Sequence, residues 1–356
     1  MIAGGGTGGH LYPGIAVAQE LLGRGPEHAV LFAGTDRGLE ARVLPRYGLP
    51  FAAVRAAGVV GTGVRGTLRA LGLLAVGLAD AAALLRRFRP DACLGVGGYV
   101  SFPVVALARL AGVPSAVHEQ NATPGLANRV LGRLVHRIYA GVPEAAQGFP
   151  ARKTRVTGNP LRRSLAAPLP YRPPGPAEPA RVLVVGGSQG SRALNELVPA
   201  ALADLTRPLE VWHQAGRGKA EAVAARYGEA PARRVVEYID EMDRAYAWAH
   251  LVVARAGALT VAELAAAGRP AILVPFPHAA GGHQEANARA AEGRGAALCR
   301  VEAGLTPREL GEAVAGLLAD PDRLTAMAAA AAQTAPRQAA AAIVDDLLAL
   351  AGRRRR

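Results

Sequence analysis

Two glycine-rich turns, about half the chain apart, constrain the fold more than any other feature of this sequence. The aliphatic residues 182–185 are followed by Gly186-Gly187-Ser188-Gln189-Gly190, after which apolar residues recur at helical spacing. The first ten residues repeat this design around Gly4-Gly5-Gly6-Thr7-Gly8-Gly9-His10. A strand, a glycine turn and a helix in this order leave the first N–H groups of the helix unpaired, which suits a phosphate. We therefore expect an α/β protein with two similar domains that face each other.

The chain is long enough for two domains. Its 356 residues exceed the size at which one hydrophobic core usually stops growing, and 51% hydrophobic with 19% charged residues is typical of a globular protein. Strand and helix patterns alternate throughout, which indicates parallel sheets with crossover helices. Six prolines from Pro168 to Pro179 can be neither helix nor central strand. The boundary is therefore expected near Asn159-Pro160, between domains 1–160 and 161–335.

The expected elements follow the apolar runs and their spacing. In the first half we expect a short first strand, further strands at 29–33, 51–54, 92–96, 115–118 and 137–140, and helices at 11–22, 37–47, 66–88, 102–111 and 124–134. In the second half we expect strands at 182–185, 210–214, 235–238, 251–253, 271–274 and 297–298, and final helices at 307–319, 322–333 and 336–351.

The formal charge of +13 is unevenly distributed along the chain. Residues 1–160 carry 17 Arg and Lys against 8 Asp and Glu, a net charge of +9. Such a basic half implies an anionic partner, and nucleic acid, anionic lipid or a phosphorylated substrate would all fit. Aromatic residues make up only 4% of the chain and do not interleave with the basic ones, so we expect no nucleic-acid partner.

Cysteine usage and hydropathy bound the compartment. Cys93 and Cys299 lie far apart without metal or redox spacing, which is typical of a reduced, cytoplasmic protein. The chain start has no basic and apolar leader pattern, and the longest charge-free run, 92–108, contains glycines and a proline. We therefore expect neither a signal peptide nor a membrane-spanning helix.

Three readings of the glycine turns compete. Gly4-x-Gly6-x-x-Gly9 satisfies the dinucleotide fingerprint, with Asp36 as a candidate ribose carboxylate. Gly186-x-Ser188-x-Gly190 matches the nucleophile elbow of hydrolases, with Asp240 and His278 following in the required order. In the third reading each turn holds the phosphates of a different substrate. No Asp-x-Asp or His-x-x-x-His pattern occurs, so helix N-termini and arginines would stabilise a leaving diphosphate, and we expect no metal or other cofactor.

Seven motifs in a fixed order narrow the choice. They are the turn at 4–10, Gly95-Val96-Gly97-Gly98-Tyr99-Val100-Ser101, His118-Glu119-Gln120-Asn121, Gly158-Asn159-Pro160-Leu161-Arg162, the turn at 184–190, Arg255-Ala256-Gly257-Ala258-Leu259-Thr260-Val261-Ala262-Glu263, and His283-Gln284-x-x-Asn287. With them the chain resembles, along nearly its whole length, the MurG family of bacterial UDP-N-acetylglucosamine transferases.

This resemblance implies a GT-B fold, in which two Rossmann-like parallel-sheet domains face a cleft. It implies an acceptor and membrane-facing domain over 1–160, with the C-terminal helix 336–356 packed back on it, and a UDP-GlcNAc domain over 161–335. The implied activity is inverting transfer of GlcNAc from UDP-GlcNAc to the C4 hydroxyl of lipid I, at the cytoplasmic face of the membrane, with partners in cell-wall synthesis. A nucleotide-sugar epimerase of the same fold, a diacylglycerol glycosyltransferase and a serine hydrolase remain as alternatives.

The resemblance also carries family roles to matching positions. His10 and Glu119 are the implied catalytic residues. Gly6, Tyr99, Glu119 and Asn121 are implied to contact the acceptor. The residues implied to contact the donor are Thr7, Gly8, Gly9, Asn121, Arg162, Ser188, Ile239, Ala258, Leu259, Thr260, Val261, Ala262, Glu263 and Gln284. Within this set Arg162 and Ser188 would meet the diphosphate, the Ile239 backbone the uracil, Glu263 the ribose, and Gln284 beside Asn287 the sugar.

Several of these residues have a plainer interpretation. His10 could simply pack at a helix start, although that position disfavours the protonated ring, as a general base requires. Thr260-x-x-Glu263 is also a capping-box pattern.

The helix expected within 64–89 carries an apolar stripe at Leu71, Leu74, Leu78, Leu85 and Phe88, with Arg65, Arg69, Arg86, Arg87 and Arg89 around it. A crossover helix packed on a sheet explains the stripe, and so does a peripheral contact with an anionic membrane surface.

Overall fold

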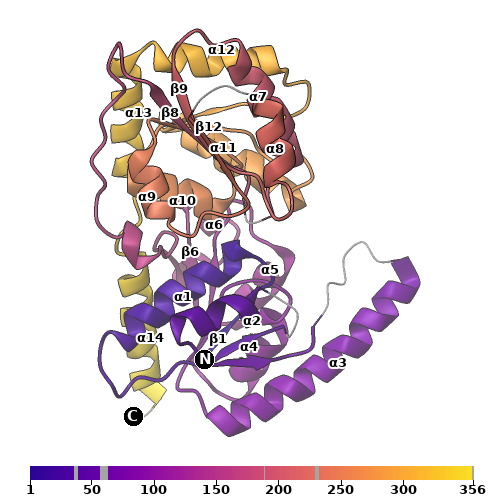
Figure 1. Cartoon of the computed structure of the whole chain (residues 1–356). Coiled ribbons are helices and arrows are strands. Elements are labelled where there is room, and N and C mark those ends of the chain that lie inside the picture. The colour runs from indigo at the N-terminus through magenta and orange to yellow at the C-terminus, as the bar shows by residue number, and fades with distance from the viewer. Residues whose placement is uncertain (36–38, 57–62, 188, 229–231, 355–356) are drawn as a thin grey trace. The chain divides into compact units, whose positions relative to one another are not determined.

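In a computed structural model of the chain, described for residues 1–35, 39–56, 63–187, 189–228 and 232–354, the backbone folds into two compact units. Unit 1 comprises Met1–Arg162 with Arg337–Arg356, and unit 2 comprises Arg163–Pro336 (Figure 1). Each unit is a parallel sheet covered by helices, which is the α/β class expected from the alternating pattern.

Among the described residues, the sheet of unit 1 has seven strands in the order β3-β2-β1-β4-β5-β6-β7, all paired in parallel. The strands are β1 (Ile2–Ala3), β2 (Phe32–Gly34), β3 (Phe51–Ala53), β4 (Cys93–Gly95), β5 (Ser115–Glu119), β6 (Arg137–Ala140) and β7 (Thr154–Val156). The central strands are buried on both faces because helices cover both sides of a parallel sheet.

The helices of unit 1 include one that arrives from the far end of the sequence. They are α1 (Gly8–Leu22), α2 (Glu40–Val43), η1 (Leu44–Tyr47), α3 (Gly63–Phe88), α4 (Ser101–Leu110), α5 (Leu126–Leu134), α6 (Pro143–Ala146), η2 (Ala151–Lys153) and α14 (Ala339–Arg354). Helix α14 packs against α1. Its buried Asp346 accepts hydrogen bonds from Tyr139 Oη at 2.9 Å and Arg137 Nε at 3.0 Å on β6. These two bonds anchor the C-terminal helix to the first sheet.

Unit 2 repeats the design. Among the described residues its sheet has six strands in the order β10-β9-β8-β11-β12-β13, again parallel. The strands are β8 (Ala180–Val185), β9 (Leu209–Gln214), β10 (Arg233–Val236), β11 (Leu251–Ala254), β12 (Ala271–Leu273) and β13 (Ala297–Cys299). The helices are η3 (Arg163–Leu165), α7 (Arg192–Ala203), α8 (Ala220–Tyr227), α9 (Met242–Trp248), α10 (Ala258–Ala267), η4 (Ala280–Gly282), α11 (His283–Gly293), α12 (Pro307–Leu318) and α13 (Pro321–Gln333).

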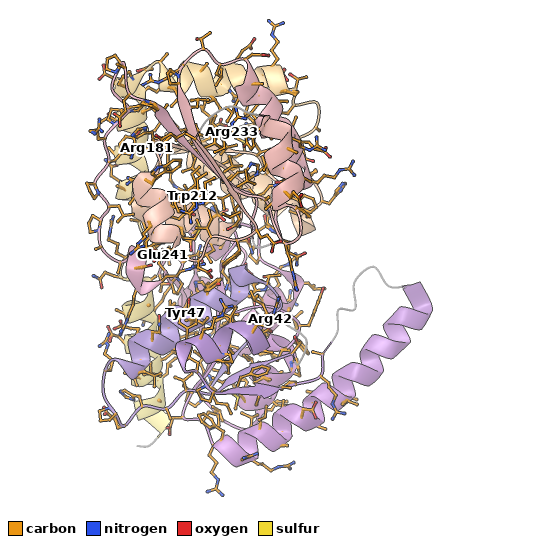
Figure 2. The ribbon with its side chains drawn as sticks, viewed as in Figure 1. Arg42, Tyr47, Arg181, Trp212, Arg233 and Glu241 are labelled. Carbon is orange, nitrogen blue, oxygen red and sulfur yellow. The ribbon has the colours of Figure 1, made fainter. Side chains whose placement is uncertain are left out.

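The edge strand β10 of unit 2 is covered by arginines. Figure 2 labels Arg233 and Trp212, which lie on the neighbouring strands β10 and β9. The Arg233 guanidinium lies 4.8 Å from the ring centre of Tyr227, and that of Arg234 lies 4.1 Å from the ring centre of Trp212. Charged side chains on an edge strand discourage pairing with another chain.

The observed elements differ from the expected ones mainly at their ends. The helix expected over 37–47 is two short pieces, α2 and η1, because Pro45 has no N–H to continue the α-helical ladder. Residues 36–38 of that segment lie outside the described residues. The strand expected at 29–33 begins only at Phe32, and β7 at the sheet edge was not expected. None of the described helices combines the length and apolarity needed to span a bilayer.

Candidate substrate-binding sites

The first glycine turn needs glycine for two physical reasons. Gly4, Gly5 and Gly6 have φ values of +149°, +146° and +84°, which side chains rarely adopt. A Cβ at Gly5 would also lie 1.8 Å from Oε1 of Glu40. Glu40, which the sequence interpretation missed, is fully buried and accepts a hydrogen bond from Gly6 N at 2.8 Å. The turn is therefore built on a buried carboxylate.

The first backbone N–H groups of α1 differ in whether they are already bonded. Gly4 N donates to Ala33 O, Gly5 N donates to Gly97 O, and Gly6 N donates to Glu40, so these amides are engaged. The N–H groups of Thr7, Gly8 and Gly9 have no acceptor among the described residues, and the first turn of α1 holds no acidic residue. An anion is therefore suited to Thr7, Gly8 and Gly9, whereas the engaged amide of Gly6 is not directed at a ligand.

His10 lies in the first turn of α1 and is half-buried. Its Nδ1 is 3.3 Å from both Gly5 O and Thr7 Oγ1. Because a carbonyl oxygen only accepts, the bond to Gly5 requires the proton on Nδ1, and the neutral ring then presents Nε2 as an acceptor. Gly97, at φ +99°, lets the ring approach, since a Cβ there would lie 2.5 Å from His10 Cδ2. The same contacts therefore pack the His10 ring against Gly97 and fix the direction of its Nε2 atom.

Glu119, at the carboxyl end of β5, is only 2% exposed, and its carboxylate holds the following loop. Its Oε1 accepts from Asn121 N at 3.0 Å and Asn121 Nδ2 at 3.2 Å. Its Oε2 accepts from Gly125 N at 3.1 Å and Asn128 Nδ2 at 2.9 Å. Four donors leave this carboxylate little capacity for a substrate proton. Nothing in the sequence motif distinguishes this role from a catalytic one.

The neighbours of Glu119 form a buried polar network. His118 is fully buried, with Nε2 3.2 Å from Gly158 O and Nδ1 accepting from Gln120 Nε2 at 3.0 Å. Burial lowers the pKa of His118 to about 4, so the ring is neutral at physiological pH.

Tyr99, which the resemblance assigns to the acceptor substrate, is 63% exposed.

Arg162, the last residue before unit 2, is placed by an aromatic ring. Its guanidinium lies 4.0 Å from the ring centre of Tyr12 in α1, a cation–π geometry. This contact brings Arg162 to the same helix that carries His10.

The second glycine turn is tied to the next two strands. Gly187 and Gly190 have positive φ, and a Cβ at Gly190 would lie 2.0 Å from Ala215 O. Buried Gln214, at the end of β9, donates from Nε2 to Gly187 O at 2.8 Å. Its Oε1 accepts from Ile239 N at 3.0 Å. One side chain therefore joins the turn to Ile239; Ser188 itself lies outside the described residues.

Helix α10 begins at an N-terminus that its own side chains do not cap. Its N-cap is Gly257, and the N–H groups of Ala258, Leu259 and Thr260 have no acceptor among the described residues. Thr260 is the third residue of the helix, so the capping-box interpretation of Thr260 and Glu263 is wrong. The pattern matches by chance, because the helix starts three residues earlier than a Thr260 cap requires.

Two further residues of unit 2 belong to the expected donor set. Glu263 is 5% exposed and accepts a hydrogen bond at Oε2 from Tyr246 Oη at 3.1 Å. Gln284 Oε1 accepts from Phe276 N at 3.0 Å. This bond fixes the orientation of the side-chain amide and does not involve its Nε2 group. Asn287 is buried and donates to Ala256 O at 3.1 Å, so it holds the backbone just before α10. Val261 and Ala262 follow within the same helix.

Arg255, at the end of β11, is a buried cation that the sequence interpretation left without a role. It pairs with Glu302, and its guanidinium also donates to Val274 O and Pro275 O. Its charge is thus used inside the unit to fix the chain after β12.

The dinucleotide and hydrolase interpretations of the turns are not tested by the described residues. Asp36 and Ser188, on which the dinucleotide and hydrolase interpretations rest, both lie outside the described residues. In the described part of the chain, no group of three or more His, Cys, Asp or Glu side chains is arranged to hold a metal ion.

Two parallel-sheet units, each with an open helix N-terminus at the carboxyl end of its sheet, have the architecture of the GT-B class. Residues 1–140 match the glycosyltransferase family 28 N-terminal domain, and residues 181–343 match the glycosyltransferase family 28 C-terminal domain. The chain belongs to glycosyltransferase family 28.

Named relatives agree with this assignment. A UDP-N-acetylglucosamine–N-acetylmuramyl-(pentapeptide) pyrophosphoryl-undecaprenol N-acetylglucosamine transferase of Nitratidesulfovibrio vulgaris is 46% identical over 97% of this chain and 96% of its own length. The crystal structure of Acinetobacter baumannii MurG has a TM-score of 0.79 at 34% identity and covers 98% of both chains. A UDP-N-acetylglucosamine 2-epimerase structure has a TM-score of 0.68 over 98% of this chain and 94% of its own, but at 15% identity it shares only the fold.

Proposed function

We propose that this enzyme transfers GlcNAc from UDP-GlcNAc to the C4 hydroxyl of N-acetylmuramic acid in undecaprenyl-diphosphate-linked lipid I, forming lipid II for peptidoglycan. The observation that carries this is the 46% identity, over nearly the full length, to a relative named for this reaction. The two open helix N-termini, at α1 and α10, support it because both substrates carry a diphosphate.

The donor is assigned to unit 2. The free N–H groups at the start of α10 would bind the diphosphate, together with Arg162 and Ser188. The Ile239 carbonyl would accept from uracil N3–H. The bond from Ile239 N to Gln214 Oε1 holds this stretch of backbone in place. Glu263 would accept from the ribose hydroxyls, and the Nε2 group of Gln284 would donate to a sugar hydroxyl.

The acceptor is assigned to unit 1. The N–H groups of Thr7, Gly8 and Gly9 would bind the acceptor diphosphate or the transferred sugar, and Tyr99 and Asn121 would also contact the acceptor. His10 would act as the base, with Nδ1–H held by Gly5 O and Nε2 facing the proton to be removed. Glu119 would support the reaction by holding the loop after β5 rather than by touching the substrate.

The chemistry follows as a single displacement. The acceptor O4 attacks C1 of GlcNAc while the bond from C1 to the β-phosphate oxygen breaks, which inverts the anomeric centre to a β-1,4 linkage. His10 Nε2 takes the hydroxyl proton. The charge that develops on UDP would be stabilised by backbone N–H groups and by Arg162.

A peripheral position at the cytoplasmic membrane surface is part of this proposal, because the acceptor is lipid-linked. In the described part of the stripe expected on α3, Leu85 is buried, Leu78 is half-buried, and Phe88 packs against the core of unit 1. The side chains of Leu71 and Leu74 lie outside the described residues.

Helix α5 instead exposes an apolar ridge made of Leu126, Val130 and Leu134, which are 59%, 39% and 47% exposed. The exposed Arg129 and Arg133 lie between these residues in the helix. An apolar ridge flanked by cations fits the interface of an anionic bilayer.

The proposal is tested by incubating the enzyme with labelled UDP-GlcNAc and a short-chain lipid I analogue. The expected product is a labelled disaccharide lipid, formed in equal amount to UDP. Release of UDP without acceptor, epimerised UDP-sugar, or transfer only to diacylglycerol would contradict the assignment.

A further inference from the structure

We propose that Tyr246 is a positioning residue for the donor ribose, acting through the carboxylate of Glu263. This inference rests on the proposed function, in which the Glu263 carboxylate accepts hydrogen bonds from the ribose hydroxyls of the donor. It assigns ribose selectivity to two helices of unit 2, α9 and α10, which lie side by side (Figure 1).

The contact itself is buried and directional. Tyr246 is 0% exposed and Glu263 is 5% exposed, so water competes little with the bond between them. The hydroxyl donates to Glu263 Oε2 at 3.1 Å. A carboxylate has about four lone-pair sites, so this bond at Oε2 fixes the plane of the group without occupying all of them.

Tyr246 is held at its other end by a buried cation. Arg269 is 1% exposed and donates from Nε to the carbonyl of Tyr246. Its remaining nitrogens donate to Ala267 O at 2.8 Å, Gly268 O at 3.3 Å and Pro170 O at 2.8 Å. Burial lowers the pKa of Arg269 to about 10, so it stays charged at neutral pH. Charge-assisted bonds of this kind fix the end of α9 to the end of α10.

The physical consequence is pre-organisation. An unheld Glu side chain samples several rotamers, and ordering it on ligand binding opposes affinity. The Tyr246 hydroxyl removes that freedom before the donor arrives. Discrimination between ribose and 2′-deoxyribose depends on a hydrogen bond whose geometry must be good, so it should fall when the hydroxyl is removed and the ring is kept.

The experiment compares Tyr246→Phe with Glu263→Gln and with the matched control Tyr227→Phe. Tyr227 is a buried tyrosine of unit 2 whose hydroxyl bonds to His213 Nδ1 at 2.8 Å, and His213 is not one of the assigned donor residues. For each protein, kcat/KM is measured with UDP-GlcNAc and with its 2′-deoxyuridine counterpart, and dissociation constants for UDP and 2′-deoxy-UDP are measured below the melting temperature. The ratio between the two donors does not depend on how much of a preparation is folded.

The parent enzyme should prefer the ribose donor by about 10- to 150-fold, and Glu263→Gln should bring this preference close to unity. Tyr246→Phe should lower it by about 2- to 12-fold. Tyr227→Phe should leave it unchanged. In the Glu263→Gln background, adding Tyr246→Phe should change the ratio no further, because the hydroxyl acts through that carboxylate.

A full ribose preference in Tyr246→Phe, with Glu263→Gln having lost it, overturns the role of Tyr246 alone. A preference that survives Glu263→Gln removes the ribose assignment and the inference with it. The transferase assay with lipid I is a separate readout in both cases, so failure of the proposed function is distinguishable from failure of this inference.

Discussion

Two buried glutamates organise the loops that carry the candidate residues of unit 1. Glu40 accepts from Gly6 N, and Glu119 accepts from the backbone of Asn121 and Gly125. A carboxylate that receives backbone N–H groups fixes a loop more strongly than a neutral acceptor does. At the residue scale, these two acidic side chains hold the backbone, and the proposed base is the imidazole of His10.

His10→Ala tests the proposed base. We expect kcat to fall about 10²- to 10⁴-fold, which is the usual effect of losing a general base, while KM for UDP-GlcNAc changes little. Steady-state kinetics with a lipid I analogue measure both constants. A variant within a few-fold of the parent in kcat would leave His10 with only its packing against Gly97.

Gly5→Ala tests the support of the first turn. A Cβ at Gly5 would meet Glu40 Oε1 at 1.8 Å, whereas nothing lies within 4 Å of a Cβ at Gly6. Both positions have positive φ, so Gly6→Ala controls for backbone strain. We expect Gly5→Ala to destabilise the protein by about 1–3 kcal/mol more than Gly6→Ala, because overpacking adds to strain. Urea unfolding measures the difference. If both variants lose the same free energy of unfolding, the Glu40 side chain moves aside without a cost in stability.

The candidate residues that could be predicted from the sequence are those in contiguous motifs. The turns around Thr7 and Ala258 follow strands and begin helices, which local patterns reveal. Glu40 and Tyr246 could not be predicted in this way, because their partners Gly6 and Glu263 lie 34 and 17 residues away. A contact across such a separation depends on the fold and leaves no periodic signal.

At the scale of elements, Gln214 connects the ends of three neighbouring strands. It follows the last apolar residues of β9 and bonds to Gly187 beyond β8 and to Ile239 beyond β10. The carboxyl ends of parallel strands are where α/β sheets bind ligands. The spacing between the glycine turn and Ile239 is therefore set by one amide side chain.

The strand positions themselves were largely predictable, since buried parallel strands read as short apolar runs. β6 occupies 137–140 as expected, and β5 extends one residue beyond the expected end. β7 was missed because Thr154–Val156 is short, partly exposed and only one residue in three apolar, so it carries no apolar run. α2 and η1 differ from the single expected helix because Pro45 interrupts it.

Gln214→Leu tests this connection. The substitution keeps the volume but leaves Gly187 O and Ile239 N without their partner, so we expect the Kd for UDP to rise about 10-fold. Gln120→Leu is the matched control, because Gln120 is a buried glutamine of unit 1 with comparable bonds to Val96 O and His118. Calorimetric titration with UDP separates the two. Equal weakening in both variants would mean that general destabilisation, and not the link to Ile239, is responsible.

For the whole molecule, buried neutral histidines couple stability to pH. Burial lowers the pKa of His118 in unit 1 and of His213 in unit 2 to about 4. The unfolded chain takes up these protons near pH 6.5, before the folded state does. Their contribution to stability is therefore complete above pH 6.5 and is lost as pH falls towards 4.

His213→Gln should make this dependence shallower. Each buried histidine contributes a slope of up to about 1.4 kcal/mol per pH unit between pH 6.5 and 4, so removing one removes that part of the slope. Urea midpoints across this range measure it. The exposed His278 supplies the control His278→Gln, which should keep the parent slope. If the stability of His213→Gln falls with pH as steeply as that of the parent protein, a neutral, buried ring at this position is contradicted.

The net charge of +9 over residues 1–160 belongs to the same scale, and it points to an anionic surface as partner. We expect binding to vesicles with anionic lipid to weaken as salt rises, since the Debye length is only about 10 Å at 0.1 M. On the α5 ridge, Arg129→Ala with Arg133→Ala should weaken binding by about 30-fold, because each basic residue at such a surface contributes about 1 kcal/mol. The control replaces Arg192 and Arg308, exposed arginines of unit 2, and changes the net charge equally. Co-sedimentation with vesicles of known anionic-lipid content measures the binding of the parent protein and of both double variants. Equal losses in the two double variants would assign the attraction to net charge and not to α5, and binding indifferent to salt would remove the electrostatic contact altogether.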